Sequence, residues 1–410
     1  MINPGLIRLD DFNYPLPAER IAQFPLTERD ESQLLVVRNG IITQAVFSEI
    51  GSFLPAESQL VFNDTRVIRA RLVFHKTTGS KIEIFCLEPI APFTEVEAAF
   101  KQTSGCTWKC LVGNAKRWKS GTLQMTYGNK GTCENLYADY ISDLGEGCFA
   151  IAFHWDPPEK TFSEILESAG IVPLPPYIHR HTVATDAQRY QTIYATHEGS
   201  VAAPTAGLHF TDQVLDKIKK QGSTFARVTL HVGVGTFRPV STPVITDHVM
   251  HSEKMVVTKQ TVEQILDRLE RPIIAVGTTS ARTVESLYWL GVKLLRNSSL
   301  ENPVVLQWDP YQDTCQVEVS PRESLTALRS FLDQRQWSEY RGETQLMILP
   351  GYKYKLLSGL ITNFHMPQST LLMLVAAMIG EDWKKAYQYA LENNFRFLSY
   401  GDCCLFYNPA

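Results

Sequence analysis

Four loops of one design constrain the fold of this chain more than any other feature of its sequence. Each is rich in small and polar residues and ends a strand or opens a helix; the loops occupy residues 199–210, 233–239, 277–280 and 360–370. Ligands of open α/β sheets bind in the crevice outside the carboxyl ends of the strands. The loops therefore predict one site at the edge of a mixed sheet, which is typical of an enzyme. The residues alone do not name its reaction.

The first loop, residues 199–210, contains two glycines, a proline and three alanines, so it fits neither an amphipathic helix nor a regular strand. Thr211 or Asp212 can cap the apolar-periodic helix that follows and ends at Gly222. Free N–H groups at such a helix start form an anion site. His209 closes the loop as a polar group of tunable charge, next to a helix dipole that lowers the pKa of its ring. A single turn of this kind is more often only a tight connection.

The second loop follows a strand expected over residues 226–234. Its Gly-x-Gly run has no third glycine and no following helix, so it fits a dinucleotide fingerprint poorly. The third loop follows an apolar strand at 273–276 and leads into a helix over 281–290 that we expect to end at Gly291. Strand, polar loop and helix form the α/β unit whose strand end binds ligands.

The fourth loop again follows a strand, and Ser369 or Thr370 can cap the next helix. That helix, residues 371–379, is apolar all round and must be buried. Residues 395–402 form a further strand-to-turn segment with a tyrosine and a carboxylate. The polar stretch from Asn297 to Glu343 has weak patterning, which indicates an irregular surface insertion.

The amino-terminal third combines a hairpin with a group of arginines. Asn39-Gly40 between two apolar runs is a strong hairpin signal, and residues 14–25 indicate a short helix between prolines. A short apolar strand, residues 59–62, leads to three arginines, Arg66, Arg69 and Arg71. These are either a solvated strand face or a set of bidentate phosphate ligands.

Residues 72 to about 155 change character. Short β-prone runs separated by Gly, Ser and Asn turns predict a small antiparallel barrel or sandwich; the runs are 81–87, 107–112, 122–127 and 148–154. The basic turn Lys116-Arg-Trp-Lys119 can contact nucleic acid, but it is more typical of an exposed turn with one anchoring aromatic side chain.

Composition excludes several classes. A length of 410 residues suggests two or three domains, and a net charge of −4 argues against a wholly basic nucleic-acid binder, although not against a local basic face. The longest apolar run, residues 371–380, is too short to span a membrane, and the N-terminus lacks the regions of a signal peptide. We therefore expect a cytoplasmic protein with reduced cysteines.

Two groups of residues invite a metal hypothesis, and neither supports it well. Four cysteines of the barrel region lack the paired spacing of zinc ligands: Cys106, Cys110, Cys133 and Cys148. His248, His251 and Glu253 cluster on a loop, where closely spaced polar residues more often bind no metal. We expect no metal site.

Several long motifs closely resemble one family. They are Leu60-Val-Phe-Asn-Asp-Thr-Arg66, Pro175-Pro-Tyr-Ile178, Ser200-Val-Ala-Ala-Pro-Thr-Ala-Gly-Leu-His-Phe210, Leu230-His-Val-Gly-Val-Gly-Thr-Phe-Arg-Pro239, Met250-His-Ser-Glu253, Ala275-Val-Gly-Thr-Thr-Ser280, Ile361-Thr-Asn-Phe-His-Met-Pro-Gln-Ser-Thr-Leu371 and Arg396-Phe-Leu-Ser-Tyr-Gly-Asp402. Together they resemble the S-adenosylmethionine:tRNA ribosyltransferase-isomerase family of queuosine synthesis over nearly the whole chain. In two departures, His179 stands where the family usually has lysine, and the stretch 297–342 is longer than usual.

The resemblance implies an α/β fold: a discontinuous mixed-sheet domain, residues 1–71 and 156–410, with a small antiparallel β-barrel domain inserted at 72–155. It implies transfer and isomerisation of the ribosyl group of S-adenosylmethionine onto 7-aminomethyl-7-deazaguanine at the tRNA wobble position. The products would be epoxyqueuosine in tRNA, adenine and methionine. It implies no metal or other cofactor, because S-adenosylmethionine is a substrate. We expect a monomer or weak homo-oligomer.

In this chemistry the sulfonium acidifies the ribose 5′ carbon, and a base removes a proton to give an ylide. Ring opening then expels adenine with help from a hydrogen-bond donor. The amine attacks the opened sugar, and methionine leaves as the epoxide closes. The motif residues that can titrate are the catalytic candidates: His209, His231, His251, Glu253, His365 and Asp402. The substrate-binding candidates are Asp64, Arg66, Arg69, Thr205, Gly207, Gly233, Gly235, Arg238, Thr278, Thr279, Arg282, Asn363 and Tyr400, with Arg238 or Arg282 holding the methionine carboxylate.

Two other classes stay open. An S-adenosylmethionine-dependent RNA methyltransferase would need a glycine-rich loop after a first strand and an acidic residue after the second, and the amino-terminal third has neither. A non-catalytic RNA-binding protein would fit poorly with the negative net charge and the polar loops.

Overall fold

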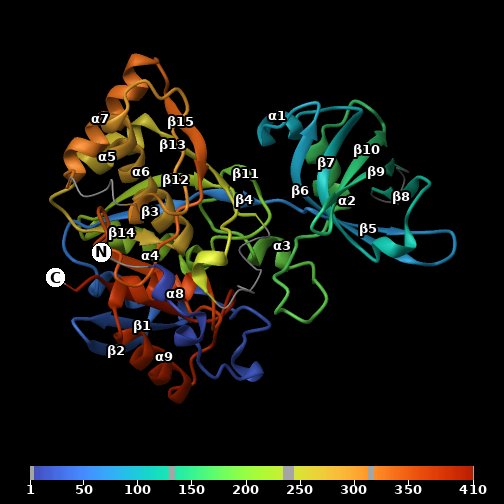
Figure 1. The fold of residues 1–410 in the computed structure, drawn as a ribbon. Helices are drawn as coiled ribbons and strands as arrows, with labels where there is room; N and C mark the ends of the chain where they lie inside the picture. The colour runs from blue at the N-terminus through green and yellow to red at the C-terminus, as the bar shows by residue number, and fades with distance from the viewer. Residues whose placement is uncertain (1–3, 129–133, 234–243, 313–317, 410) are drawn as a thin grey trace.

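A computed structural model describes residues 4–128, 134–233, 244–312 and 318–409, and most of this chain is organised on one nine-stranded mixed sheet (Figure 1). In spatial order its strands are β15 (Glu339–Thr344), β13 (Glu253–Thr258), β12 (Thr224–Leu230), β3 (Gln59–Asn63), β14 (Ile273–Val276), β16 (Gly359–Asn363), β17 (Cys403–Tyr407), β1 (Gln33–Arg38) and β2 (Ile41–Val46). The four strands in the middle, β12, β3, β14 and β16, run parallel to one another. Their carboxyl ends therefore meet at one edge.

Helices cover both faces of this parallel block, which explains why its strands are apolar along their whole length. Alternate residues of β3 point to opposite faces: Val61 packs with one core, and Leu60 and Phe62 pack with the other. The first core includes side chains of α5 (Lys259–Leu266), α6 (Thr278–Arg296), α7 (Pro321–Gln334), α8 (Thr370–Ile379) and α9 (Asp382–Glu392). The second includes α4 (Asp212–Lys220) and the 3-10 helix η5 (Phe47–Ser52).

Both ends of the chain contribute to one side of the sheet. The predicted hairpin is confirmed as β1 and β2, with Asn39 and Gly40 both at positive φ in the turn. This hairpin joins the sheet through β17, which pairs parallel with β1 and antiparallel with β16. The prediction of a strand within residues 395–402 is wrong, because the strand formed here, β17, begins only at Cys403.

Six further strands form a separate antiparallel sheet that lies to one side of the main body (Figure 1). They are β5 (Arg71–His75), β6 (Lys81–Ala91), β7 (Gly105–Gly113), β10 (Cys148–Asp156), β9 (Glu134–Gly145) and β8 (Leu123–Tyr127), in spatial order. The edge strands β5 and β8 lie close together, so the sheet is nearly closed into a barrel around its own core. Two of these strands, β5 and β9, were not predicted. The fold class is confirmed, while the domain boundaries stay a prediction.

Small elements connect these units. A two-stranded parallel sheet pairs β4 (Thr65–Val67) with β11 (His197–Ser200), and the short helices are α1 (Val96–Phe100), α2 (Phe162–Ala169) and α3 (Asp186–Arg189). The remaining 3-10 helices are η1 (Pro4–Leu6), η2 (Leu9–Phe12), η3 (Ala18–Arg20), η4 (Arg29–Glu31), η6 (Ala115–Arg117), η7 (Thr205–His209), η9 (Ile245–Asp247) and η10 (Asp309–Tyr311). Within the described ranges, no helix has the length and apolar character needed to cross a membrane.

Two predictions fail around α6. The helix begins at Thr278 and continues through Gly291 to Arg296. Gly291 permits close packing rather than ending the helix, because a Cβ there would lie 2.0 Å from the carbonyl oxygen of Ser324 on α7. The supposed irregular insertion at 297–343 contains α7 and most of β15; α7 has a capping box of Ser320 and Glu323 and a buried apolar face.

Candidate active site

A large cavity lies at the carboxyl ends of the parallel strands. This strand-end pocket has a volume of about 280 Å³ and draws its walls from the ends of β12 and β16, the start of α6 and the loop before η7. It is lined by Pro176, Tyr177, Ala202, Ala203, Pro204, Thr205, Val232, Thr278, Thr279, Thr362, Asn363, Phe364, His365, Met366, Pro367, Ser369, Leu371, Leu398 and Ser399. A mostly apolar wall with a few convergent polar groups is typical of a small-molecule site.

The start of α6 supplies one polar part of the wall. Gly277 is the N-cap residue and has no side chain with which to cap the helix. Thr278 and Thr279 line the pocket, and Thr279 Oγ1 is buried without a hydrogen-bond partner in the part of the chain that the structure describes. A helix start with uncapped N–H groups and a spare hydroxyl fits an anionic group of a ligand.

Asn363, the last residue of β16, supplies a second polar part. Its Nδ2 donates to the carbonyl oxygens of Leu398 at 3.2 Å and Asp402 at 3.4 Å, and lies 3.1 Å from His209 Nε2. Its Oδ1 is buried and has no partner among the described residues. Buried amide oxygens normally accept a hydrogen bond, so this oxygen is suited to accept one from a ligand.

His365 is the one predicted catalytic histidine that lines the strand-end pocket. Its Nε2 lies 2.9 Å from Thr362 Oγ1, and its main-chain N–H donates to Tyr387 Oη at 3.1 Å. Burial lowers the pKa of His365 to about 3, so the ring is neutral at pH 7. No hydrogen bond of Nδ1 occurs among the described residues, which leaves this nitrogen to a ligand.

His209 is placed behind this pocket instead of inside it. It borders a separate cavity of about 20 Å³, the residue is 5% exposed, and its Nδ1 lies 2.7 Å from Ser32 Oγ. Burial, in the first place, lowers the pKa of His209 to about 3. The predicted direction is confirmed, but the main cause is burial and not the helix dipole. Asn363, which lines the strand-end pocket, lies 3.1 Å from this ring.

Of the remaining small-residue candidates, Thr205 lines the strand-end pocket and Gly207 does not. A Cβ on Gly207 would lie 2.0 Å from Tyr194 Oη, so glycine is needed there for packing. Gly233 is exposed, and Gly235 and Arg238 lie outside the described residues.

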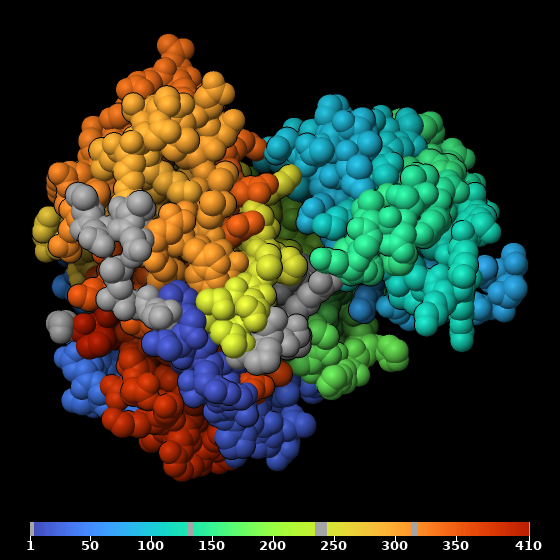
Figure 2. All heavy atoms as spheres, viewed as in Figure 1, coloured from blue at the N-terminus to red at the C-terminus, as the bar shows by residue number. Residues whose placement is uncertain are grey.

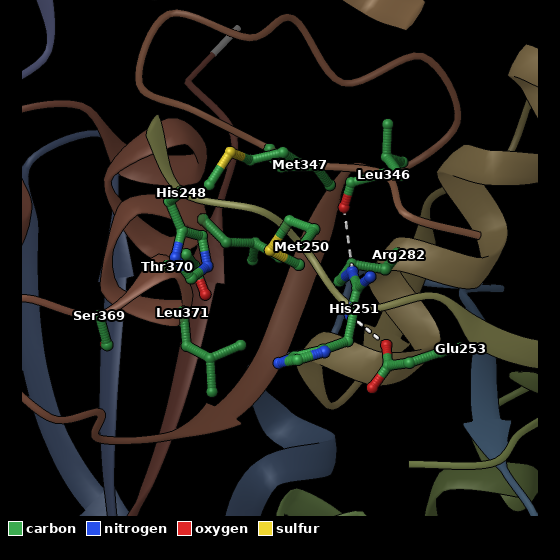
Figure 3. A pocket seen from close by; sticks show the side chains of 12 residues that line it. His248, Met250, His251, Glu253, Arg282, Leu346, Met347, Ser369, Thr370 and Leu371 are labelled. Carbon is green, nitrogen blue, oxygen red and sulfur yellow. Dashed lines mark hydrogen bonds and ion pairs between the residues drawn. The ribbon is translucent and has the colours of Figure 1, made fainter. Parts of the chain in front are cut away.

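A second cavity, of about 50 Å³, adjoins the strand-end pocket through Ser369 and Leu371, which line both. It holds His248, His251, Glu253 and Arg282 (Figure 3). Arg282 donates to the carbonyl oxygen of Leu346 at 3.1 Å and forms a buried ion pair with Glu253. Its Nη2 has no partner in the described structure. His251 is exposed, and no three side chains of the described ranges are arranged to hold a metal.

His231 lies on a different surface. It lines a cavity of about 120 Å³ with residues of α1, β13 and β15, where the main body and the barrel face each other across a notch (Figure 2). Burial lowers the pKa of His231 to about 4. The structure does not bring His231 together with His365.

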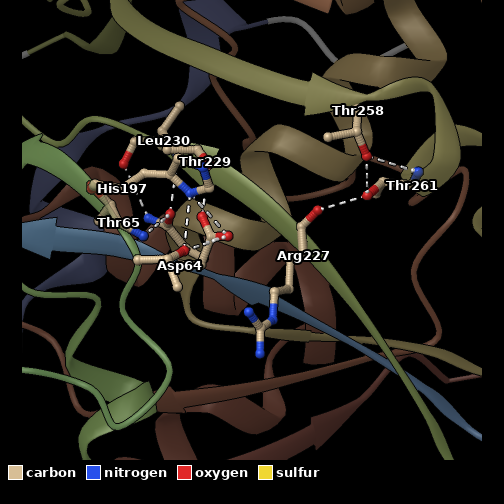
Figure 4. A network of polar contacts seen from close by, with 10 residues as sticks. Asp64, Thr65, His197, Arg227, Thr229, Leu230, Thr258 and Thr261 are labelled. Carbon is tan, nitrogen blue, oxygen red and sulfur yellow. Dashed lines mark hydrogen bonds and ion pairs between the residues drawn. The ribbon is translucent and has the colours of Figure 1, made fainter. Parts of the chain in front are cut away.

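The residues near β3 that were predicted to bind phosphate or nucleoside have partners within the protein. Asp64 is buried and accepts from Thr229 Oγ1 at 2.7 Å and Thr196 Oγ1 at 3.2 Å, and it lies 3.3 Å from His197 Nδ1 (Figure 4). Arg66 pairs with Glu198 at 3.6 Å, and Arg69 with Glu167 at 3.1 Å. Arg71 lies 3.8 Å from Glu83. None of these residues lines the strand-end pocket.

The two candidates of the last motif have structural contacts. Asp402 is buried and accepts from the main-chain N–H groups of Gln33 at 2.9 Å and Arg396 at 2.7 Å, and burial raises the pKa of its carboxyl group. Tyr400 Oη donates to Asp186 at 3.0 Å. Asp402 therefore holds β1 against the last loop.

Sequence reasoning missed several residues that line the strand-end pocket. Tyr177, Phe364, Met366 and Ser399 line it and were not among the candidates, although all four lie within the motifs that carried the resemblance. Tyr177 Oη lies 2.5 Å from Ser399 Oγ, which ties two of these distant motifs together.

Comparison with known proteins supplies the family. The model of the family described as "Queuosine biosynthesis protein" matches residues 9–406. An S-adenosylmethionine:tRNA ribosyltransferase-isomerase of Halothermothrix orenii is 39% identical over 97% of this chain and 99% of that protein. Proteins of the same name from Trichlorobacter lovleyi and Clostridioides difficile are 36% and 39% identical, each over 96% of this chain and 98% of the relative. A crystal structure of an S-adenosylmethionine tRNA ribosyltransferase from Thermotoga maritima is 28% identical, covers 96% of this chain and 99% of its own, and has a TM-score of 0.45.

These matches confirm the predicted family and the prediction that the protein is an enzyme of this type. They give no support to the methyltransferase and RNA-binding alternatives. With a family model that spans nearly its whole length and relatives of more than 35% identity, the chain belongs to the queuosine biosynthesis protein family.

Proposed function

We propose that the strand-end pocket binds S-adenosylmethionine and is the place where its ribosyl group is transferred to 7-aminomethyl-7-deazaguanine at the tRNA wobble position. Isomerisation there would give epoxyqueuosine in tRNA, with release of adenine and methionine. One observation carries this assignment: Asn363, the last residue of β16, and His365, two residues later, both offer the pocket an atom that lacks a partner among the described residues.

The methionine carboxylate is placed at the start of α6. The N–H groups of the first helical turn and the spare hydroxyl of Thr279 favour an anion, and the helix is 19 residues long. Arg282, the earlier candidate, already pairs with Glu253 in the neighbouring cavity. We therefore assign the carboxylate to Thr278 and Thr279, and the nucleoside to the wall around Asn363.

His365 is assigned the proton transfer. A neutral imidazole can accept the ribose 5′ proton, whereas an imidazolium can only donate. The low pKa keeps the ring neutral, and Thr362 fixes its orientation through Nε2. The proton taken from the 5′ carbon is then available to the departing adenine, so one ring serves both steps.

The substrates needed are S-adenosylmethionine and tRNA carrying the precursor nucleotide, and we propose a cytoplasmic location because tRNA is the substrate. The proposed assembly is a monomer or a weak homo-oligomer. We propose that neither a metal nor another cofactor takes part, because the sulfonium itself activates the carbon.

The test is incubation of the protein with S-adenosylmethionine and precursor-bearing tRNA in chelator, followed by nucleoside mass spectrometry. We expect adenine and methionine in equal amounts and the epoxide-bearing nucleoside in tRNA. Release of S-adenosylhomocysteine would indicate a methyltransferase, and binding of tRNA without consumption of S-adenosylmethionine would indicate a binding protein. Loss of activity in chelator that zinc restores would overturn the metal-free proposal.

A further inference from the structure

Three half-buried arginines from distant segments gather beside the active site. Arg29, Arg189 and Arg396, the arginine cluster, donate hydrogen bonds only to main-chain carbonyl oxygens among the described residues. Arg29 donates to Gln191 at 2.7 Å and Gln188 at 2.9 Å, and Arg189 donates to Thr27 at 2.7 Å. These bonds hold the guanidinium groups in place without neutralising them.

The cluster lacks the acid partners that several other arginines of the chain have. Arg180, nearby, makes a bidentate pair with Asp186 at 2.6 and 2.7 Å, and Arg66 and Arg69 each pair with a glutamate. In the described ranges no member of the cluster lies within 4.0 Å of a carboxylate oxygen; Asp402 acts on Arg396 only at longer range. Arg189 Nε and Arg396 Nη1 are moreover buried donors without an acceptor.

The positive charges of the arginine cluster lower the pKa of neighbouring groups. Burial lowers the pKa of Arg29, and the charge of Arg189 lowers it further. Arg396 and Arg29 add to the effect of burial on the pKa of His209. An arrangement of like charges without counter-ions is costly, and it is typical of a site whose counter-ion is a ligand.

The position of the arginine cluster indicates which kind of ligand it can bind. Arg29 and Arg189 line the cavity of about 20 Å³ that also holds Ser32 and His209, and this space admits a water-sized group such as one phosphate oxygen but not a nucleoside. Ser399 lines both this cavity and the strand-end pocket. A phosphate held here would therefore lie next to the nucleotide that enters the active site.

We propose that the arginine cluster binds a backbone phosphate of the tRNA beside the modified nucleotide, so that this cluster, and not Arg66, Arg69 and Arg71, provides the basic docking surface. The proposal rests on the proposed function in taking tRNA as the partner. Guanidinium groups suit phosphate because they offer several N–H donors in a planar fork.

The test adds a negative charge next to the arginine cluster and leaves the arginines themselves unchanged. Thr27 is exposed, and its carbonyl oxygen, which substitution leaves in place, accepts from Arg189. Thr27→Glu and Thr27→Gln differ by one negative charge, placed at the residue whose carbonyl oxygen binds Arg189. Affinity for an unmodified tRNA transcript is measured by fluorescence anisotropy over a series of salt concentrations.

We expect Thr27→Glu to weaken binding roughly three- to tenfold at low salt and to reduce the slope of log affinity against log salt by about 0.7 to 0.9, one lost phosphate contact. Thr27→Gln should match the wild type. Ser298→Glu, which adds the same charge to an exposed residue beyond the far end of α6, should also match it, because that helix of 19 residues spans about 28 Å.

Equal affinities and slopes for Thr27→Glu and Thr27→Gln would overturn the proposal, as would an equal loss in Ser298→Glu. Inorganic phosphate is titrated in parallel by calorimetry. Micromolar binding of inorganic phosphate together with an unchanged tRNA affinity in Thr27→Glu would identify a free-phosphate site and reject tRNA as the ligand.

This assay contains no S-adenosylmethionine, so it is independent of turnover. If the wild type releases no adenine while the difference between Thr27→Glu and Thr27→Gln persists, the proposed reaction fails and the arginine cluster stands. If adenine is released normally and that difference is absent, only the arginine cluster fails.

Discussion

His209 Nε2 lies 3.1 Å from Nδ2 of Asn363, so a ring outside the strand-end pocket supports an amide in its wall. Asn363 Nδ2 donates this bond, which makes Nε2 the acceptor and leaves the proton on Nδ1, opposite Ser32 Oγ. His209 is therefore a positioning residue for Asn363.

His209→Ala should lower kcat/KM by roughly tenfold, since one hydrogen bond to the amide is lost while its bonds to Leu398 and Asp402 remain. Asn363→Ala should cost more, because it removes the group that faces the ligand. The double variant should be no worse than Asn363→Ala alone. Steady-state adenine release measures all three. Fully additive losses would show that His209 acts independently of Asn363.

His365→Ala should lower kcat by about two to four orders of magnitude, the range of a general acid–base group. Thr362→Val, which removes only the partner of Nε2, should cost far less. His75→Ala, at an exposed histidine of the barrel, is the control. Wash-in of solvent deuterium at the ribose 5′ carbon should disappear in His365→Ala. If that exchange persists at the wild-type rate, another group is the base.

Glu253→Gln should destabilise the fold by about 3 to 5 kcal/mol, because it leaves the buried Arg282 without its counter-ion. The matched control is Glu167→Gln at the exposed pair with Arg69, where the expected loss is under about 1 kcal/mol. Urea unfolding followed by circular dichroism gives both values. Similar small losses at the two sites would mean that solvent reaches Arg282.

Acid should destabilise the protein through its buried histidines. Burial lowers the folded-state pKa of His209 and of His365 to about 3, below the usual 6.5, so the unfolded chain binds more protons in between. Their stabilising effect is complete above pH 6.5 and is lost as the pH falls towards 3. Each histidine contributes a slope of up to about 1.4 kcal/mol per pH unit.

The measurement is urea unfolding between pH 7 and pH 5, for the wild type and His365→Gln. The variant should show a shallower loss of stability, and other groups, including Asp402, cancel in the comparison. Parallel curves for the two proteins would show that the pKa of His365 is the same in the folded and the unfolded chain, and would contradict the prediction.

Local patterns in the sequence were enough for much of the fold. The Asn39-Gly40 hairpin, the cap of α4 at Thr211 and the cap of α8 at Ser369 each depend on residues close in the chain, and the structure confirms all three. β9 was missed because only Leu136 and Ala138 among its residues are buried and its second half is exposed. β17 was missed because the strand was placed within residues 395–402, before the turn at Gly401 and Asp402, and not after it.

The site was predicted only in outline. Strand ends and loops located it, but the direction of a side chain in a loop is set by contacts far away in sequence. His209 turns from the pocket because it is bonded to Ser32, 177 residues away, and Gly207 is glycine because Tyr194 packs against it. The arginine cluster was invisible for the same reason, since its members come from three separate segments.

The place of β17 in the main sheet has a consequence for synthesis on the ribosome. The hairpin of β1 and β2 is complete once residue 46 has emerged, yet its sheet neighbour is made only at Cys403 to Tyr407. At about 5 to 20 residues per second, the exposed edge of β1 waits roughly 20 to 70 s for its partner. Until then the apolar strand Leu34 to Val37 is an open template for other nascent chains, so a chaperone that shields it during translation would raise the yield of folded protein.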